Sequence, residues 1–196
     1  KKYIGCKASF SNVMAKEILP GLKNRTYDLA IGPDLSEKDS SIVFDFFVED
    51  YMLLAVPKKY MMLQKAEKRE GEKYPWMDIS MMPDEFIIQD NSCYVRQEID
   101  QIFEEYGKEL KPKMIVNSSM LAMQTLERGM GFCFISEVFL PYITNTKDID
   151  FFCIGKNKVK KTKTGIIYLK NKILSRQEKY CISVLKEKII NGEIGA

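Results

Sequence analysis

Three segments of this 196-residue sequence share one layout, in which a strand-like apolar run leads through small polar residues into a helical pattern. The polar stretches are residues 8–12, residues 89–92 and residues 117–119. Strands that alternate with helices are typical of α/β proteins. The layout therefore predicts an α/β fold with mainly parallel sheets.

Hydrophobic spacing predicts the individual elements. The clearest helix follows residues 89–92 and ends at Gly107, since its apolar residues repeat at helical spacing: Val95, Ile99, Ile102, Phe103 and Tyr106. The first helix is expected to end near Leu19, and the third carries Ala122, Met123 and Leu126 and ends at Gly129. A capping box at Ser175–Glu178 starts a last helix, whose predicted inner face is Cys181, Val184, Leu185 and Ile189. Strands are predicted at residues 3–6, 27–32, 42–48, 51–56, 85–88, 114–116, 131–135, 150–154 and 165–169.

The composition excludes several kinds of chemistry. The sequence contains no histidine, which removes Ser-His-Asp and Cys-His catalysis and the commonest metal ligand. Its five cysteines never occur at CxxC spacing, so we expect reduced thiols that mostly fill the core, and no zinc site. No general base stands out at a plausible site. We therefore expect a binding protein that holds no metal or cofactor and is not an enzyme.

Charge and hydropathy limit the partners. No apolar run reaches the roughly 18–20 residues that a membrane span needs, and no secretory leader begins the sequence. Together with the cysteines, this favours a cytoplasmic protein. The net charge of +3 is too small to indicate a nucleic-acid surface. The basic stretch at residues 156–163 could contact phosphate, but it lacks interleaved aromatic residues and is better interpreted as a solvated turn.

The polar junctions are candidates for a binding site. Taken singly, a Ser, Asn or Asp at a helix start is usually a cap that accepts a hydrogen bond from a free backbone N–H. In a parallel sheet, however, every strand-to-helix turn lies at the carboxyl edge, where ligands bind. Free N–H groups and the helix dipole suit carboxylates, phosphates and other anions. Several such junctions at one edge therefore predict an anion-binding site.

With these junctions in view, the sequence resembles the effector-binding domain of LysR-type transcriptional regulators. Four stretches carry the resemblance: YIGCKASFSNVMAKEILP, YDLAIG, DYMLLAVPKKY and VNSSMLAMQTLERGMGFCFIS. Residues 86–107, with Arg96 and Asp100, are also similar to the first helix of that family's second lobe. No single stretch is specific to this family, but the occurrence of all of them in the family's order along most of the chain is.

The resemblance implies two Rossmann-like lobes joined by a hinge, similar to a type 2 periplasmic binding protein. Residues 1–55 and 166–196 would form lobe I, and residues 56–165 would form lobe II. The hinge would lie at residues 54–57 and 163–167. A small effector, often a carboxylate-bearing metabolite, would bind between the two lobes of the chain. The protein would form a homodimer or homotetramer.

The resemblance also implies where the effector would touch the chain. Lobe I would contribute Ser9, Phe10 and Ser11, with Gly32 and Pro33 at the mouth of the cleft. Lobe II would contribute Asn91, Ser92, Asn117, Ser118 and Ser119, and Met130 and Gly131 from the turn that begins at Gly129.

Two departures from the family pattern stand out. The family's winged helix-turn-helix is absent from this sequence, so operator DNA would be reached only through a DNA-binding domain outside it. After Pro20, the family has a further strand and most of a helix, about 25 residues, on the scale of a strand plus crossover. Here residues 21–26 lead directly into the next predicted strand.

Other functions remain open at this stage. A solute-binding protein of a transporter has the same two-lobe shape, and some transferases and dehydratases use a similar scaffold. A sharper variant of the sensing hypothesis makes Cys93 a redox sensor, because it lies near a predicted helix N-terminus, which lowers a thiol pKa. No nearby cysteine in the sequence is an obvious resolving partner, which favours a structural role.

Overall fold

The computed structural model describes residues 7–11, 13–91 and 93–190, and the strand predicted at residues 3–6 lies outside them. In the described part, strands and helices alternate as predicted. The strand order is β1-β7-β2-β5-β3-β4, with β6 paired to β2. The chain divides into two compact units, which are residues 1–49 with 163–196 (unit 1) and residues 50–162 (unit 2). The lobe boundaries given above stay a prediction.

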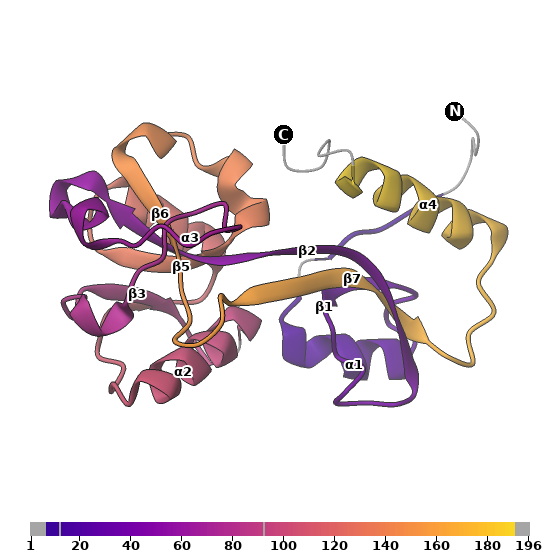
Figure 1. The fold of residues 1–196 in the computed structure, drawn as a ribbon. Helices are drawn as coiled ribbons and strands as arrows, with labels where there is room; N and C mark the ends of the chain where they lie inside the picture. The colour runs from indigo at the N-terminus through magenta and orange to yellow at the C-terminus, as the bar shows by residue number, and fades with distance from the viewer. Residues whose placement is uncertain (1–6, 12, 92, 191–196) are drawn as a thin grey trace. The chain divides into compact units, whose positions relative to one another are not determined.

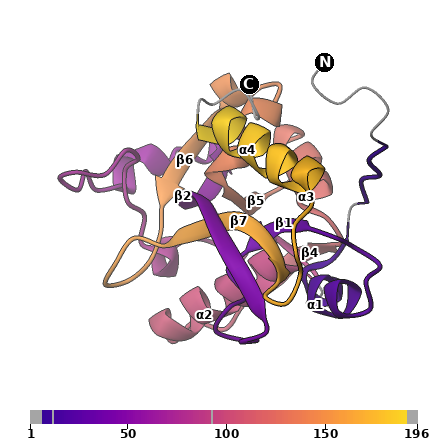
Figure 2. The ribbon, with the colours of Figure 1, turned by 90° about the vertical axis from the view of Figure 1, so that its right-hand side faces the viewer.

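Unit 1 is a short sheet with one helix on each face (Figure 1, Figure 2). Its elements are α1 (Ala15–Lys23), β1 (Ala30–Pro33), the first half of β2 (Ile42–Pro57), most of β7 (Lys161–Leu169) and α4 (Arg176–Ile190). In β7, Ile167 packs with Ile18 and Leu22 of α1. The preceding residue, Ile166, packs with Ile182 of α4. Neighbouring residues of a strand point to opposite faces, so each helix covers one face of the sheet.

The last helix begins as predicted but buries a different face. The N–H of Ser175 donates to the Glu178 carboxylate at 2.7 Å, and the N–H of Glu178 donates to the Ser175 hydroxyl at 3.2 Å, which confirms the capping box. The predicted inner face is wrong at its centre, because Ile182 is buried whereas Cys181 is only half-buried. Leu185 packs beside Ile182, Val184 is half-buried, and the side chain of Ile189 lies outside the described part.

Helix α1 extends past its predicted end and closes in a Schellman motif. It was expected to stop near Leu19 but runs to Lys23, because the next turn buries Leu22 in the core. The N–H of Thr26 donates to the carbonyl of Gly21 at 2.8 Å, and the N–H of Arg25 donates to that of Leu22 at 3.1 Å. Arg25 therefore occupies the left-handed position that glycine usually takes, with φ at 58°.

Replacing Arg25 by glycine is expected to raise the free energy of unfolding by about 0.5–1 kcal/mol. The left-handed conformation costs a side chain roughly 1–2 kcal/mol, and the greater freedom of glycine in the unfolded chain offsets part of this gain. Thermal unfolding followed by circular dichroism measures the difference. The control is Arg128→Gly, since Arg128 also follows a helix but has φ at −84°, and this variant should be less stable than the parent. A destabilised Arg25→Gly protein would contradict the assignment of strain.

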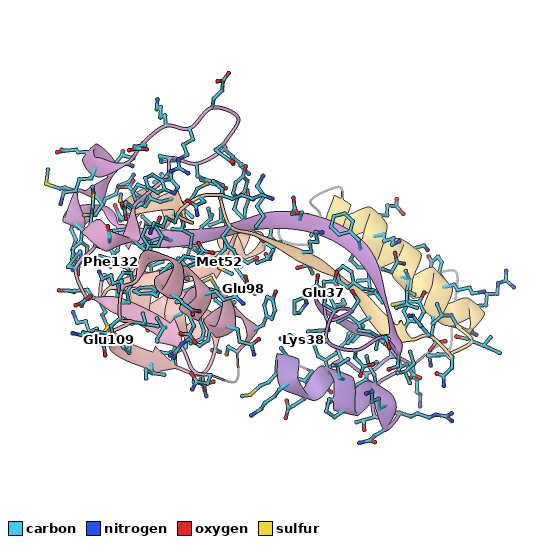
Figure 3. All side chains as sticks on the ribbon, turned by 60° about the horizontal axis from the view of Figure 1, so that its bottom comes forward. Glu37, Lys38, Met52, Glu98, Glu109 and Phe132 are labelled. Atoms are coloured by element: carbon cyan, nitrogen blue, oxygen red, sulfur yellow. The ribbon has the colours of Figure 1, made fainter. Side chains whose placement is uncertain are left out.

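Unit 2 is a sheet between two helices (Figure 1). Its strands are the second half of β2, β3 (Phe86–Gln89), β4 (Pro112–Val116), β5 (Phe132–Ser136) and β6 (Ile149–Cys153), and its helices are α2 (Tyr94–Tyr106) and α3 (Ser119–Glu127). Short 3-10 helices lie at Lys58–Tyr60, Met62–Lys65, Ile79–Met81, Glu137–Tyr142 and Thr146–Asp148. Phe86 and Ile88 face the core under α2, together with Met52 and Phe132, which are labelled in Figure 3. Ile87, between them in sequence, faces the core under α3.

The face predicted for α2 is confirmed, since Ile99, Ile102 and Phe103 are buried and the other predicted members pack at its margin. Glu98, labelled in Figure 3, is also buried on this helix. Its carboxylate pairs with the Lys160 ammonium at 2.5 Å. This lysine of the basic stretch thus has a partner within the protein.

The expectation of mainly parallel pairing is wrong, because only the pairings of β3 are parallel among those of the described residues. β3 pairs in parallel with β4 and β5. β2 instead pairs antiparallel with β5 and β6, and β1 pairs antiparallel with β7. The strands predicted at residues 42–48 and 51–56 form the single strand β2. Of the two acidic residues between them, Glu49 and Asp50, the second is buried with hydrogen-bond partners and so does not end the strand.

Candidate functional site

The carboxyl edge of the parallel strands in unit 2 gathers polar residues. β3, β4 and β5 run in one direction, so their carboxyl ends share an edge. Residues 90–91 follow β3, residues 117–119 follow β4, and Ser136 and Glu137 close β5. This edge is where α/β proteins place ligands.

The start of α3 has hydrogen-bonding capacity left over. Ser118 is the N-cap, and its hydroxyl accepts from the N–H of Leu121 at 3.2 Å. Asn117 is exposed. Within the described residues, no acceptor takes the N–H groups of Ser119 and Met120 in the first turn. These two donors at the positive end of the helix dipole, and the Ser118 O–H, are suited to an anion.

The junctions after β3 and β4 lie against each other. The N–H of Asp90 donates to the carbonyl of Val116 at 2.8 Å. The Cys93 sulfur, at the N-cap of α2, lies 3.6 Å from the carbonyl oxygen of Asn117, where a neutral thiol donates. The residues that lead into α2 and α3, two helices on opposite faces of the sheet, therefore contact each other at this edge.

Gln89, the last residue of β3, lies buried beneath these turns. Its side-chain NH₂ donates to the Ser119 hydroxyl and to the carbonyl of Phe134, each at 3.4 Å. The β3–β5 ladder pairs Phe86 with Phe132 and Ile87 with Cys133, and Gln89 then reaches across to β5 by its side chain. Its side-chain carbonyl oxygen is buried and has no partner in the described structure. The sequence contained Gln89 in its polar junction but gave no sign of this bridging role.

A buried carboxylate that sequence reasoning missed lies beside the end of β5. Asp50, 4% exposed, accepts from the hydroxyl of Thr162 at 2.7 Å, from the N–H of Val138 at 3.2 Å and from the hydroxyl of Ser136. Asp50 and Thr162 are the first and last residues of unit 2. One carboxylate thus ties together β2, β5 and β7. A charged residue inside an apolar strand pattern is the only sequence signal for it.

Glu137, which follows Ser136 at the end of β5, is ionised at this end of the edge. It accepts hydrogen bonds from Lys73 and from Tyr74, the latter at 2.8 Å. Burial acts to raise the pKa of Glu137, but these hydrogen bonds outweigh it and hold the pKa below its usual value. Burial and the bond to Glu137 raise the pKa of Tyr74 to about 12.

The structure places the predicted contact residues in different regions. Asn91, Asn117, Ser118 and Ser119 lie at the carboxyl edge of unit 2, and Ser92 lies outside the described residues. Met130 and Gly131 precede β5, where the N–H of Phe132 donates to the carbonyl of Glu85 before β3. They therefore lie at the amino ends of these strands, away from the other four. Ser9, Phe10 and Ser11 are exposed ahead of α1, and Gly32 and Pro33 end β1, all in unit 1. Each binding role stays a prediction.

The described part of the chain lacks both a candidate metal site and a candidate membrane-spanning helix. The described residues contain no group of three or more Asp, Glu and Cys side chains that could hold a metal ion. In the same part of the chain, no helix is both long enough and apolar enough to cross a bilayer.

Replacing Ser118 by alanine is expected to lower the free energy of unfolding by about 1 kcal/mol, because the N–H of Leu121 loses its cap. Urea denaturation followed by Trp76 fluorescence measures the change, since Trp76 is buried in unit 2. Ser80→Ala is the matched control, because Ser80 is exposed in the same unit and bonds Asp78 through its backbone N–H, which alanine keeps. Equal stability of the two variants would mean that Ser118 is not a cap.

Comparison with known proteins assigns the fold to a family. The family model described as "LysR substrate binding domain" matches residues 1–189, and no curated protein sequence matches the chain. A solved structure titled as the effector binding domain of QuiR in complex with shikimate is 19% identical and has a TM-score of 0.70, covering 94% of this chain and 81% of that one. The Synechocystis PCC6803 CcmR regulatory domain in complex with 2-PG is 16% identical with a TM-score of 0.74, covering 95% and 85%.

A third similar structure is that of Corynebacterium glutamicum OxyR, a C206S mutant titled as H2O2-bound. It is 13% identical and has a TM-score of 0.67, covering 93% of this chain and 55% of that one. These likenesses confirm the predicted α/β fold of the type 2 periplasmic-binding-protein kind. The match over residues 1–189 shows that the chain belongs to the LysR substrate binding domain family.

Proposed function

We propose that this chain is the effector-sensing domain of a LysR-type transcriptional regulator and that it binds a small anionic metabolite at the carboxyl edge of unit 2. The observation that carries the proposal is the meeting of the α2 and α3 N-termini at one sheet edge. There the N–H groups of Ser119 and Met120 have no acceptor among the described residues. The titles of two similar structures name small-molecule complexes, with shikimate and with 2-PG, which supports a small effector.

In this proposal the domain binds its effector and does not convert it. The hydroxyl of Ser118 already accepts from a backbone N–H, and no histidine is present to activate it as a nucleophile. The effector would stabilise one arrangement of the lobes, since a ligand shifts an equilibrium only through different affinities for its two states. A homodimer or homotetramer in the cytoplasm would pass the change to DNA-binding domains outside this chain.

Calorimetry against a panel of small carboxylates and amino acids tests the proposal. We expect at least one member to bind, and Asn117→Ala to weaken that binding about tenfold, the loss of one charge-assisted hydrogen bond. Asn117 is exposed at the α3 start, so its loss should leave stability unchanged. Asn157→Ala removes an equally exposed amide elsewhere and should change nothing. A panel without any binding, or equal affinity of both variants, would count against the proposal.

A further inference from the structure

Unit 1 contains a cavity of about 400 Å³ that is separate from the carboxyl edge of unit 2. It lies between the end of α1, the turn before β1 and the segment that joins β7 to α4. Its lining includes Leu22, Arg25, Tyr27, Asp28, Leu169, Lys172 and Ile173. We propose that this cavity is a second small-molecule site, which takes a small monoanion with an apolar body. Its volume is within the range of known ligand pockets.

The apolar part of the ligand would contact one side of the cavity. Leu169 is partly exposed and packs against the core of unit 1, to which the buried Leu22 belongs. Ile173 is 94% exposed at the cavity, so its side chain is almost fully in water without a ligand. A bound apolar group would remove part of the Ile173 side chain from water, which is favourable in proportion to the area covered.

The charges at the cavity determine the sign of the ligand. Lys172 is already neutralised, because its ammonium lies 2.7 Å from the Asp28 carboxylate and 2.9 Å from that of Glu178. Arg25 also lines the cavity, and no carboxylate of the described residues pairs with its guanidinium. The two cations and two carboxylates at the cavity sum to zero, and Arg25 is the cation among them that has no carboxylate partner within the described residues. A guanidinium binds a carboxylate through two parallel hydrogen bonds, which makes a carboxylate the preferred anion.

The backbone of Arg25 provides an independent argument. Its φ of 58° puts it in the glycine position of the Schellman motif that ends α1. Glycine there would relieve strain, so the arginine is unfavourable for stability at this position. Strained residues of this kind are concentrated at functional sites. Stability alone would favour glycine at position 25. A ligand bound by the guanidinium would explain why arginine is found there.

The experiment is a titration of the chain with 3-phenylpropionate, monitored through the methyl NMR signals of Leu169 and Ile173. The neutral alcohol 3-phenylpropan-1-ol has the same apolar body without the charge. We expect saturable shifts with the acid and at least tenfold weaker binding of the alcohol. Arg25→Gly should also lose tenfold or more in affinity while its melting temperature rises, so misfolding cannot explain the loss.

Arg128→Ala is the charge control, because it removes an exposed arginine from unit 2, and it should bind the acid as the parent chain does. Any of four results would overturn the proposal. The methyl signals of Leu169 and Ile173 could stay unmoved, the alcohol could bind as tightly as the acid, or Arg25→Gly could bind like the parent chain. Shifts confined to methyl groups of unit 2, such as Leu121, would also overturn it, by placing the acid at the effector site.

Discussion

Replacing Phe86 by alanine is expected to lower the free energy of unfolding of unit 2 by about 4 kcal/mol. Phe86 is fully buried on β3, and its ring centre lies 5.2 Å from that of Phe103 and 5.7 Å from those of Phe132 and Phe134. Alanine would leave a cavity among three aromatic rings from α2 and β5, and the lost contacts add to the lost burial. Urea denaturation followed by Trp76 fluorescence measures the loss.

Ile115→Ala is the control for this prediction, since Ile115 is 59% exposed on β4 of the same unit. It should lower stability by less than about 1 kcal/mol. Phe86→Leu keeps most of the buried volume and should fall between the two. If Phe86→Ala and Ile115→Ala lowered stability equally, the aromatic cluster would not be the centre of the unit 2 core.

Replacing Asp50 by alanine is expected to lower the free energy of unfolding by about 3 kcal/mol. The change leaves the hydroxyls of Ser136 and Thr162 and the N–H of Val138 without their buried acceptor. An unsatisfied buried polar group costs about 1–3 kcal/mol, and relaxation or water entry reduces the total. The same denaturation experiment measures the change.

Two comparisons isolate the role of Asp50. Asp100→Ala removes an exposed carboxylate paired with Arg96 and should cost less than about 1 kcal/mol. In a double-mutant cycle, Asp50→Ala with Thr162→Val should show a coupling of about 1 kcal/mol, because each change removes the same hydrogen bond. Additive effects of the two changes would contradict the proposed tie between β2 and β7.

The elements that follow a single local rule were predictable from sequence. The helical repeat of Ile99, Ile102 and Phe103 gave the face of α2, and Ser175 with Glu178 gave the start of α4. Where tertiary contacts decide, local reasoning failed. Burial of Leu22 extends α1 past its expected end, and the antiparallel pairing of β2 depends on strands distant in sequence.

The features of the candidate site also differ in whether local sequence could predict them. Ser118 as an N-cap follows from its place before a helical pattern, since capping is local. The roles of Gln89 and Asp50 depend on partners 30 to 112 residues away, which no local pattern indicates. Met130 and Gly131 were placed with Asn117 by the family resemblance, and no local pattern shows where they lie. A helix separates the two groups and carries them to opposite ends of the strands.

The most direct test of the central claim, that the first turn of α3 binds an anionic effector, is amide NMR. The chain is titrated with the ligand found by calorimetry while the backbone N–H signals of Ser119 and Met120 are followed. If the account is right, these two amides shift downfield and saturate with the calorimetric affinity, because they donate to the anion. Saturable binding that leaves both amides unmoved would contradict the account.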